Sequence, residues 1–457
     1  MARQSRGFHG GHPETPAAPP PGLAARVAAA RAVAEALTAS RPLDERLAAD
    51  PTQPRGGLDA RDRALARSIA TVALRRLGTI RKALMRRLDK GMPKRGGALE
   101  WTLIVAAAQI LFLDTPDHAA VDLAVKATRA EPASAPFAAL ANAVLRAIAR
   151  DRDDILAGSD PLEDDTPAWL AQRWRSTFGE SVARAIALAH RSEPTLDLSV
   201  RSDPADWAEK LGGVVLPTGS VRLDTHARVA ELEGYAEGQW WVQDAAAALP
   251  ARLLRPAASM RIVDLCAAPG GKAAELAAAG VDLTAVDRSA ERLKLLAANF
   301  ARLRLTSEIV VADALAFEAP PFDGVLLDAP CTATGTIRRH PDVAWTKRAG
   351  DLAPLVRLQA ALLDKAIALA RPGGAIVYCV CSLEPEEGEA QIAAVLRRNP
   401  DVRRLPVAAE EIGGLAECLT PSGDLRTLPC HLRGDNPRRS GMDGFFAARL
   451  VKTAQRG

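Results

Sequence analysis

Hydrophobic residues recur at two different spacings along the 457-residue chain, and the spacing changes near residue 261. Over residues 23–153 apolar positions repeat every three or four residues, as at Leu65 and Ile69, which is typical of amphipathic helices. The apolar run Leu103–Leu113 suits a helix that is buried on all sides. This pattern predicts an all-α domain over residues 23–153.

From Arg261 onward, short apolar runs alternate with helical stretches. Strands are predicted at Ile262–Leu265, Leu283–Val286, Ile309–Ala312 and Gly324–Leu327. Helices are predicted at Gly270–Ala279, Glu291–Leu303 and Leu355–Leu369. This alternation predicts an α/β domain with a parallel, doubly wound sheet, in which ligands bind beyond the carboxyl ends of the strands. The turn at Asp264 and four further residues with reactive or hydrogen-bonding side chains fall at these ends: Asp287, Asp313, Asp328 and Cys381.

The rest of the chain divides into a tail and a connecting region. Residues 1–22 are rich in Gly and Pro and predict a disordered tail. The acidic stretch Asp160–Asp165 predicts a linker, and residues 160–225 a small α/β subdomain. Residues 226–457 form the predicted C-terminal domain, with Gln239–Asp244 opening a helix that continues to about Leu254. Trp169 and Trp174 favour packing over base stacking.

Composition narrows the class of protein. The chain has 48% hydrophobic residues and a net charge of +4, and it lacks an apolar signal core or a run long enough to span a bilayer. Six scattered cysteines favour reduced thiols over a disulfide framework. We therefore expect a cytoplasmic protein that does not bind membranes and acts as a monomer. Basic pairs between Arg75 and Arg95 form a candidate phosphate-facing stripe, although charge runs are usually solvated faces.

Two cysteine-containing stretches stand out. Val377–Pro385 contains Cys379 and Cys381, whose side chains project to the same face of a strand. Alone, this pair favours two small buried residues, or half a metal site, over a nucleophile. A second stretch, Leu327–Gly335, contains Cys331. Together with the loop Asp264–Lys272, these stretches predict one site, to which we assign no metal.

The loop after the first strand has glycines at a turn into a helix, where a ligand meets free amide donors. It lacks the spacing of a Walker A loop or of a dinucleotide-binding turn. Asp287 is placed for ribose hydroxyls and Asp313 for an adenine amino group, although each alone is also typical of a helix cap. The pattern favours S-adenosylmethionine, with these loop residues as its predicted contacts: Cys266, Ala267, Ala268, Pro269, Gly270, Gly271 and Lys272.

Five segments carry a family resemblance: Asp264–Lys272, Asp328–Cys331, Arg338–Asp342, Tyr378–Glu387 and Asp443–Phe446. They resemble the motifs of the Nop/Sun family of RNA cytosine-5 methyltransferases. The segments His118–Val125 and Leu140–Arg146 resemble the helical RNA-binding module of NusB-type factors, so the domain order is similar to the RsmB (Sun, Fmu) group of ribosomal-RNA enzymes. The chain departs from the family at Cys379-Val380, where Ser-Thr is usual, and at Ala273, where Thr or Ser is common.

The resemblance implies a fold and a mechanism. A NusB-like helical domain and a small α/β linker domain would precede a class I (Rossmann-like) S-adenosylmethionine-dependent methyltransferase domain. Carbon 5 of cytosine reacts only after a thiolate adds at carbon 6, a role that the resemblance gives to Cys381. It gives Cys331 the release of the product. Asp328 is placed to bind the cytosine ring as well as the cofactor.

The implied substrate is a cytosine in RNA, most consistent with small-subunit (16S) ribosomal RNA. Lys272 is a candidate contact to the cofactor or the RNA backbone, and Arg338 and Arg339 are candidate phosphate contacts. Two other interpretations differ in testable ways. In a DNA cytosine-5 methyltransferase, Cys331 would be the nucleophile and a large target-recognition insert would be present. A non-catalytic RNA-binding or ribosome assembly factor with a methyltransferase-like fold would need neither cysteine.

Overall fold

The computed structural model describes residues 20–47, 58–225, 227–434 and 436–453, so most of the predicted tail lies outside the described residues. Contacts divide the chain into two compact units. The first comprises the described residues up to Glu35, together with Asp44–Ala73 and Ala83–Leu156. The second comprises Ala36–Leu43, Leu74–Lys82 and the described residues from Ala157 onward. Among the described residues, no helix is long and apolar enough to cross a membrane.

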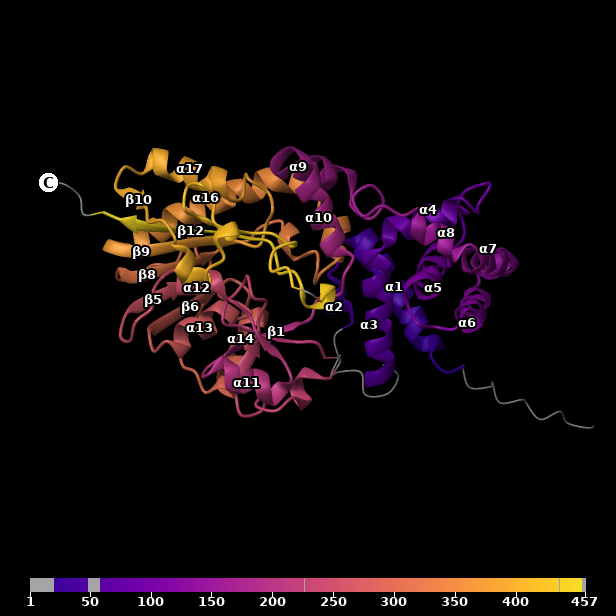
Figure 1. The fold of residues 1–457 in the computed structure, drawn as a ribbon, viewed down its shortest axis with the longest axis horizontal. Helices are drawn as coiled ribbons and strands as arrows, with labels where there is room; N and C mark the ends of the chain where they lie inside the picture. Colours follow the sequence, from indigo (N-terminus) through magenta and orange to yellow (C-terminus); the bar gives the residue numbers. More distant parts are fainter. Residues whose placement is uncertain (1–19, 48–57, 226, 435, 454–457) are drawn as a thin grey trace, which may run out of the picture. The chain divides into compact units, whose positions relative to one another are not determined.

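The first unit is helical, as its apolar spacing predicts. Its centre is α5, whose residues from Leu103 to Leu111 are all buried because this helix is apolar on every side. The helices α6 and α7 lie beside it (Figure 1), and both are amphipathic, with one face buried. The helices of this part of the chain are α1 (Leu23–Ala39), α2 (Leu43–Arg46), α3 (Ala60–Arg75), α4 (Leu77–Met85), α5 (Leu99–Phe112), α6 (Asp117–Ala130), α7 (Ala138–Arg150) and α8 (Arg152–Ala157).

The second unit begins with two helices and a small antiparallel sheet of order β2-β3-β1-β4. The helix predicted from Gln239 is wrong: Trp240–Val242 is the strand β4, paired with β1, and only α12 near its end is helical. Two adjacent tryptophans and a valine pack better on a pleated surface than on a short helix. These elements are α9 (Ala168–Phe178), α10 (Glu180–His190), β1 (Leu196–Val200), α11 (Pro204–Leu211), β2 (Val214–Val215), β3 (Val221–Leu223), β4 (Trp240–Val242) and α12 (Leu249–Arg252).

The large sheet that follows contains the predicted parallel strands in the order β9-β8-β5-β6-β7. Beyond β9 it continues with antiparallel strands, β12 and then β10, and β11 also pairs with β12. The strands are β5 (Arg261–Asp264), β6 (Asp282–Asp287), β7 (Glu308–Val311), β8 (Phe322–Asp328), β9 (Ala370–Val380), β10 (Val402–Arg404), β11 (Leu425–Thr427) and β12 (Phe445–Lys452). The helices are α13 (Gly271–Ala278), α14 (Ala290–Leu303), α15 (Asp342–Thr346), α16 (Leu352–Leu369) and α17 (Glu389–Arg398).

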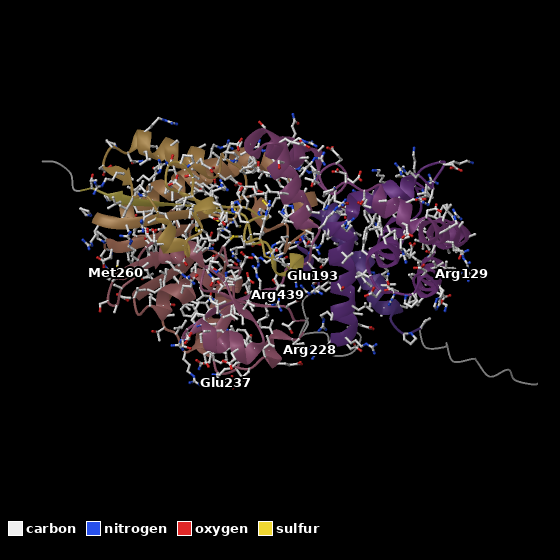
Figure 2. All side chains as sticks on the ribbon, in the orientation of Figure 1. Arg129, Glu193, Arg228, Glu237, Met260 and Arg439 are labelled. Carbon is white, nitrogen blue, oxygen red and sulfur yellow. The ribbon has the colours of Figure 1, made fainter. Side chains whose placement is uncertain are left out.

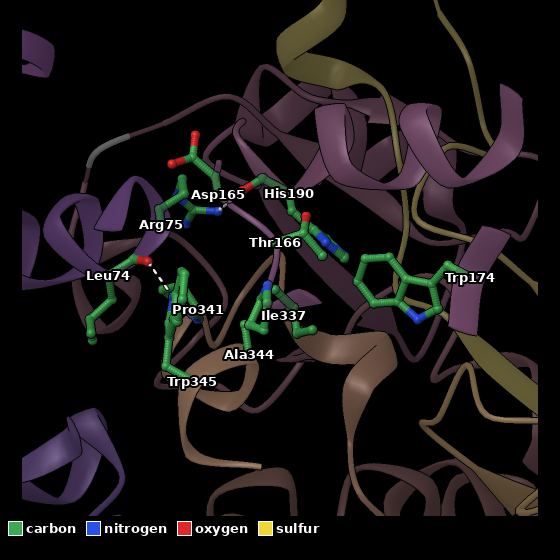
Figure 3. A pocket seen from close by; sticks show the side chains of 11 residues that line it. Leu74, Arg75, Asp165, Thr166, Trp174, His190, Ile337, Pro341, Ala344 and Trp345 are labelled. Carbon is green, nitrogen blue, oxygen red and sulfur yellow. Dashed lines mark hydrogen bonds between the residues drawn. The ribbon is translucent and has the colours of Figure 1, made fainter. Parts of the chain in front are cut away.

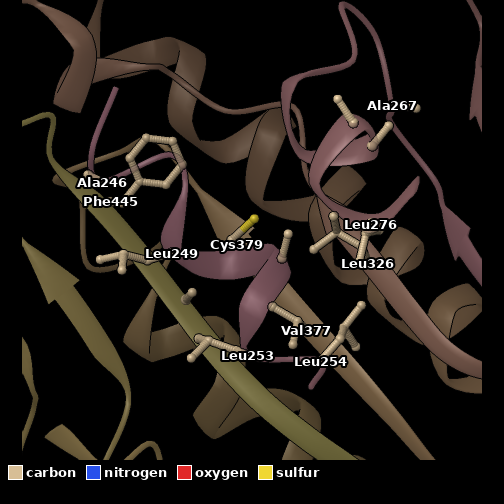
Figure 4. Close-up of a cluster of buried hydrophobic side chains, with 14 of the residues drawn as sticks. Ala246, Leu249, Leu253, Leu254, Ala267, Leu276, Leu326, Val377, Cys379 and Phe445 are labelled. Atoms are coloured by element: carbon tan, nitrogen blue, oxygen red, sulfur yellow. The ribbon is translucent and has the colours of Figure 1, made fainter. Parts of the chain in front are cut away.

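Side chains alternate between the two faces of this sheet and fill two separate cores. Val377 and Cys379 of β9 point into the core formed with α12, α13 and α14 (Figure 4). Tyr378 and Val380 of the same strand point into the core formed with α16 and α17. Figure 1 shows α16 and α17 on one side of the sheet and α12 and α13 on the other. The period of two fixes which strand-end side chains face the site.

The acidic stretch predicted as a linker is instead held by hydrogen bonds within the second unit. Asp165 is buried and forms ion pairs with Arg76, at 3.0 Å, and with Arg191, at 2.7 Å. It also accepts hydrogen bonds from the Thr79 amide and hydroxyl. A buried carboxylate with several donors is a fixed anchor, not a flexible connection.

Four side chains of the predicted phosphate-facing stripe have structural contacts, Arg75, Arg76, Lys82 and Arg87, and for the exposed ones the prediction stays open. Arg75 is buried beside a water-sized cavity of about 10 Å³ and donates to the carbonyls of His190, Ser192 and Arg338 (Figure 3). Burial lowers the pKa of Arg75 to about 10. Lys82 and Arg87 form ion pairs with Asp164 and Asp151. Exposed cations remain farther along the first unit: Arg86, Lys94, Arg95 and Arg129, the last of which is labelled in Figure 2.

Candidate active site

The carboxyl ends of the parallel strands surround a cavity of about 300 Å³. Predicted site residues line it from the ends of five strands, β5 to β9: Cys266, Ala268, Asp287, Asp313, Asp328, Cys331 and Cys381. Ala267, Pro269, Gly270, Gly271 and Lys272 lie beside it in the same loop and are not among its lining residues. Since these seven side chains follow strands that are far apart in sequence, only a parallel sheet brings them together.

The loop between β5 and α13 approaches the cavity with little side-chain bulk. Gly270 has a φ of 109°, and a Cβ at this position would lie 2.9 Å from Leu296, so the turn requires glycine. The Ala267 amide donates to the Val286 carbonyl, which ties the loop to β6. Burial is the main cause of the high pKa of Cys266, which is therefore a neutral lining residue.

Two carboxylates face the cavity from the ends of β6 and β7. Asp287 accepts amide hydrogen bonds from Ala268, at 3.2 Å, and Ser289, at 2.9 Å, and each oxygen keeps a second lone pair. Asp313 accepts from the Leu315 amide at 3.0 Å. Both carboxylates are therefore held in place with acceptor capacity left for hydroxyl or amino groups. The opposite wall is apolar, with Leu358 and Leu362 of α16, and suits a flat aromatic ring.

Behind the cavity lies a buried group of charges. Lys272 donates to Asp328 at 2.8 Å, and its ammonium lies 4.7 Å from the centre of the Phe445 ring. The Cys379 thiol lies 3.5 Å from the other Asp328 oxygen. Lys272 is thus paired with Asp328 inside the protein, and its predicted contact with the cofactor or the RNA backbone stays a prediction. The sequence predicted Cys379 only as a packing residue, whereas the structure makes it a second partner of Asp328.

Asp264, at the end of β5, has no hydrogen-bond partner for one oxygen among the described residues. Burial and the nearby Asp328 raise the pKa of Asp264 to about 7. This carboxyl group is buried and is not among the lining residues of the cavity. The cavity itself offers acceptors for hydroxyls and for an amino group, from Asp287 and Asp313, and an apolar wall, which fits S-adenosylmethionine.

The two candidate catalytic cysteines meet at the wall of the cavity. The Cys331 and Cys381 sulfur atoms are 3.5 Å apart, although 50 residues separate them in sequence. The contact with Cys381, followed by burial, raises the pKa of Cys331 well above its ordinary value. Cys331 is therefore held as a neutral thiol. Among the described residues, no group of three or more His, Cys, Asp or Glu side chains is arranged to hold a metal.

The surroundings of Arg338 do not suit the predicted phosphate contact, whereas Arg339, whose side chain is 36% exposed, keeps that prediction open. Arg338 is 2% exposed and forms an ion pair with Asp244 at 2.9 Å. Arg339 forms an ion pair with Asp443 at its Nε, at 2.7 Å, and Nη2 atoms. Sequence reasoning missed the lining residues Arg288 and Ala314, although each directly follows a predicted aspartate. Leu358 and Leu362 were predicted on one apolar face of a helix, without a role in the site.

The doubly wound sheet, the strand-end acceptors and the paired thiols define a class of protein, the S-adenosylmethionine-dependent methyltransferases with a Rossmann-like domain. Comparison with known families agrees. Residues 251–451 match the family described as 16S rRNA methyltransferase RsmB/F. Residues 23–150 match the NusB family. The predicted helical NusB-like module and the predicted methyltransferase domain are both confirmed.

Individual relatives extend the match over the whole chain. Ribosomal RNA small subunit methyltransferase B of Xylella fastidiosa (strain Temecula1) is 37% identical over 94% of this chain and 98% of its own length. The solved structure of PH0851 shares the fold, with a TM-score of 0.69 at 22% identity over 95% of this chain and 99% of its own. A methyltransferase homolog from Pyrococcus horikoshii has a TM-score of 0.53 at 26% identity, over 66% of this chain and 98% of its own.

The chain belongs to the RsmB/F methyltransferase family. Membership confirms the family resemblance predicted from the motifs, the enzyme class and the cofactor, S-adenosylmethionine. It does not test which side chains perform the chemistry.

Proposed function

We propose that this protein transfers a methyl group to carbon 5 of a cytosine in 16S ribosomal RNA through a covalent adduct with Cys381. The observation that carries the proposal is the 3.5 Å contact between the Cys331 and Cys381 thiols at the edge of the cavity. A non-catalytic RNA-binding factor has no need for two thiols in contact beside a cofactor cavity. The names of the relatives, ribosomal RNA small subunit methyltransferases B, support this choice of substrate.

In the proposed mechanism, the Cys381 thiolate adds to carbon 6 of the cytosine, and carbon 5 becomes an enamine carbon. When bound, S-adenosylmethionine would supply the methyl group for that carbon, and Asp287, Asp313 and the loop Cys266–Lys272 would hold it. Asp328, fixed by Lys272 and Cys379, hydrogen-bonds the cytosine at nitrogen 3 or its amino group.

Cys331 acts after methyl transfer. Carbon 5 must lose its proton before the bond between carbon 6 and the Cys381 sulfur breaks and the base leaves. Cys331 starts as a neutral thiol, and the largest cause of its raised pKa is its contact with the free Cys381 thiol, which is absent once that sulfur is bonded to carbon 6. Cys331 then gives its proton to water, and its sulfur accepts the proton of carbon 5. The electron pair of that carbon–hydrogen bond forms the double bond between carbons 5 and 6, and Cys381 leaves as a thiolate. In a DNA-type mechanism the two roles would be exchanged, so the cysteines distinguish the two mechanisms.

We further propose a three-part organisation, with a NusB-like domain over residues 23–153, an RNA-binding linker over 160–225 and the methyltransferase domain over 226–457. The exposed cations of the first unit, including Lys94 and Arg95, are the best placed to contact phosphates. The target base has to leave its stack to reach the cavity, which favours a loop or an opened helix in the RNA. The protein would act as a monomer in the cytoplasm, where ribosomal RNA is assembled.

The proposal is tested by bisulfite sequencing of 16S ribosomal RNA from cells with and without the gene, complemented with the parent or Cys381→Ala protein. One cytosine should resist conversion only with the parent. If every cytosine converts equally in all strains, the proposed substrate is wrong.

A further inference from the structure

One buried carboxylate, Glu387, connects the two segments that follow β8 and β9 and contain Cys331 and Cys381. We call these segments the cysteine loops. Glu387 lies six residues after Cys381, in the turn before α17, and is fully buried. Its Oε1 accepts from the amide of Thr332, the residue directly after Cys331, at 3.0 Å. Its Oε2 accepts from the hydroxyl of Ser382, the residue directly after Cys381, at 2.5 Å. The Glu387 side chain is therefore hydrogen-bonded to the residue that directly follows each cysteine.

Further donors complete the shell of this carboxylate. The Thr332 hydroxyl donates to Oε2. Gln359 of α16 donates to Oε1 at 2.9 Å and also to the Pro330 carbonyl, directly before Cys331, at 2.9 Å. The backbone carbonyl of Glu387 accepts from the Tyr378 hydroxyl at 2.6 Å. Each carboxylate oxygen thus receives two donors, and hydrogen bonds to an ionised acceptor are about twice as strong as neutral ones.

We propose that Glu387 is a positioning residue that sets the separation of the Cys331 and Cys381 thiols and thereby the rate at which the methylated base is released. The proposal rests on the roles proposed for the two cysteines. Glu387 is not among the residues that line the cavity and does not touch the cofactor or the base. Its effect passes through Thr332 and Ser382, and it should act on release more than on cofactor binding.

The alternative is that Glu387 only stabilises the fold. Both loops are also joined directly, since the Gly335 amide donates to the Cys381 carbonyl at 3.0 Å. The loops would therefore stay folded without the negative charge of Glu387, while the distance between the two thiols would become less well defined. This makes a mild substitution informative: Glu387→Gln keeps the shape and removes the charge.

The first test measures the thiol separation without RNA or cofactor. The full-length parent, Glu387→Gln and Ser382→Ala are treated with diamide, which takes two electrons and two protons from a pair of thiols. Formation of the Cys331–Cys381 disulfide is followed by mass spectrometry. We expect both variants to slow this step on the order of tenfold, because each weakens a charge-assisted hydrogen bond. The double variant should be slowed by less than the product of the two effects, since both act through one contact.

Glu386→Gln is the matched control. Glu386 is the adjacent residue, its side chain is 47% exposed, and it forms an ion pair with Arg173 instead of joining the cysteine loops. The Glu386→Gln protein should form the Cys331–Cys381 disulfide as fast as the parent. Equal rates for the parent, Glu387→Gln and Glu386→Gln would overturn the proposal.

The second test is a single-turnover reaction with RNA, in which methyl transfer and adduct breakdown are timed separately. In Glu387→Gln, breakdown should slow on the order of tenfold while affinity for S-adenosylmethionine stays unchanged. A uniform loss of cofactor affinity and of both rates would indicate a fold-stabilising residue and contradict the proposal. A parent that forms the disulfide quickly but methylates no RNA would instead refute the proposed function, leaving the positioning role in place.

Discussion

The site has two halves that the same sheet edge supports in different ways. At the ends of β6 and β7, Asp287 and Asp313 keep acceptor capacity for a ligand. At the ends of β8 and β9, the cysteine loops are joined by buried hydrogen bonds, and Glu387 receives donors from both. The first half is arranged to exchange a ligand, whereas the second is arranged to hold two thiols at a fixed distance. Loss of a single side chain should therefore lower cofactor affinity in the first half and change the rate of base release in the second.

The largest expected effect that separates the two halves of the site is at Asp287. Asp287→Ala removes the acceptor placed for two ribose hydroxyls, each hydrogen bond to a charged acceptor being worth roughly 1.5–3 kcal/mol. We expect affinity for S-adenosylmethionine, measured by calorimetry, to fall by at least about a hundredfold. Disulfide formation between Cys331 and Cys381 should not change. The control is Asp282→Ala at the start of the same strand, where the side chain is 73% exposed. An unchanged affinity in Asp287→Ala would show that the ribose binds elsewhere.

The raised pKa of Asp264 predicts that the free energy of unfolding depends on pH through this one carboxyl group. Its pKa is raised to about 7 when folded, above that of an ordinary unfolded aspartate, so the folded state holds a proton that the unfolded state has lost. Its contribution to stability is complete at acid pH and disappears as pH rises to about 7, with a slope of at most about 1.4 kcal/mol per pH unit.

Asp264→Asn should remove this slope. Chemical unfolding of the parent and the variant, without cofactor, between about pH 5 and 8 measures it. The variant should be the more stable protein at pH 8. Parallel curves for the two proteins would mean that Asp264 is ionised in the folded state over this whole range.

The smallest effect concerns charges that neither half uses. In the first unit, Lys94 and Arg95 are exposed, whereas Arg75 is buried within the second unit. Replacing Lys94 and Arg95 by Gln should lower the salt dependence of RNA binding by about 0.7–0.9 in log–log slope for each phosphate that these side chains neutralise. The control is Lys294→Gln, at an exposed position of α14 in the second unit. The same slope in all three proteins would exclude this surface from RNA binding.

The sequence was sufficient where local spacing decides the structure. Apolar period and glycine turns predicted the parallel strands and the helices α13, α14 and α16, but not α15, α17 or the antiparallel strands beyond β9. The strand-end rule placed Asp287 and Asp313 on one cavity. It was insufficient where distant segments decide. Nothing in the spacing of Arg338 shows that it pairs with Asp244, or that Arg75 is buried against three carbonyls.

The same limit explains the other errors. The strand at Trp240 exists because β1 supplies its partner, and Asp165 is an anchor because Arg76 and Arg191 converge on it. Likewise the role of Glu387 depends on Thr332, which is 55 residues away in sequence. Such long-range partners are visible only in the folded chain.

The central claim is that Cys381 forms the bond to the base and Cys331 is needed afterwards. The most direct measurement is a denaturing gel of Cys331→Ala and Cys381→Ala proteins incubated with 16S ribosomal RNA and S-adenosylmethionine, with Cys430→Ala, a cysteine outside the cavity, as the control. Cys331→Ala should accumulate a covalent protein–RNA band, because addition and methyl transfer proceed while release stalls, and Cys381→Ala should give none. A band that accumulates in Cys381→Ala and is absent in Cys331→Ala would contradict the account.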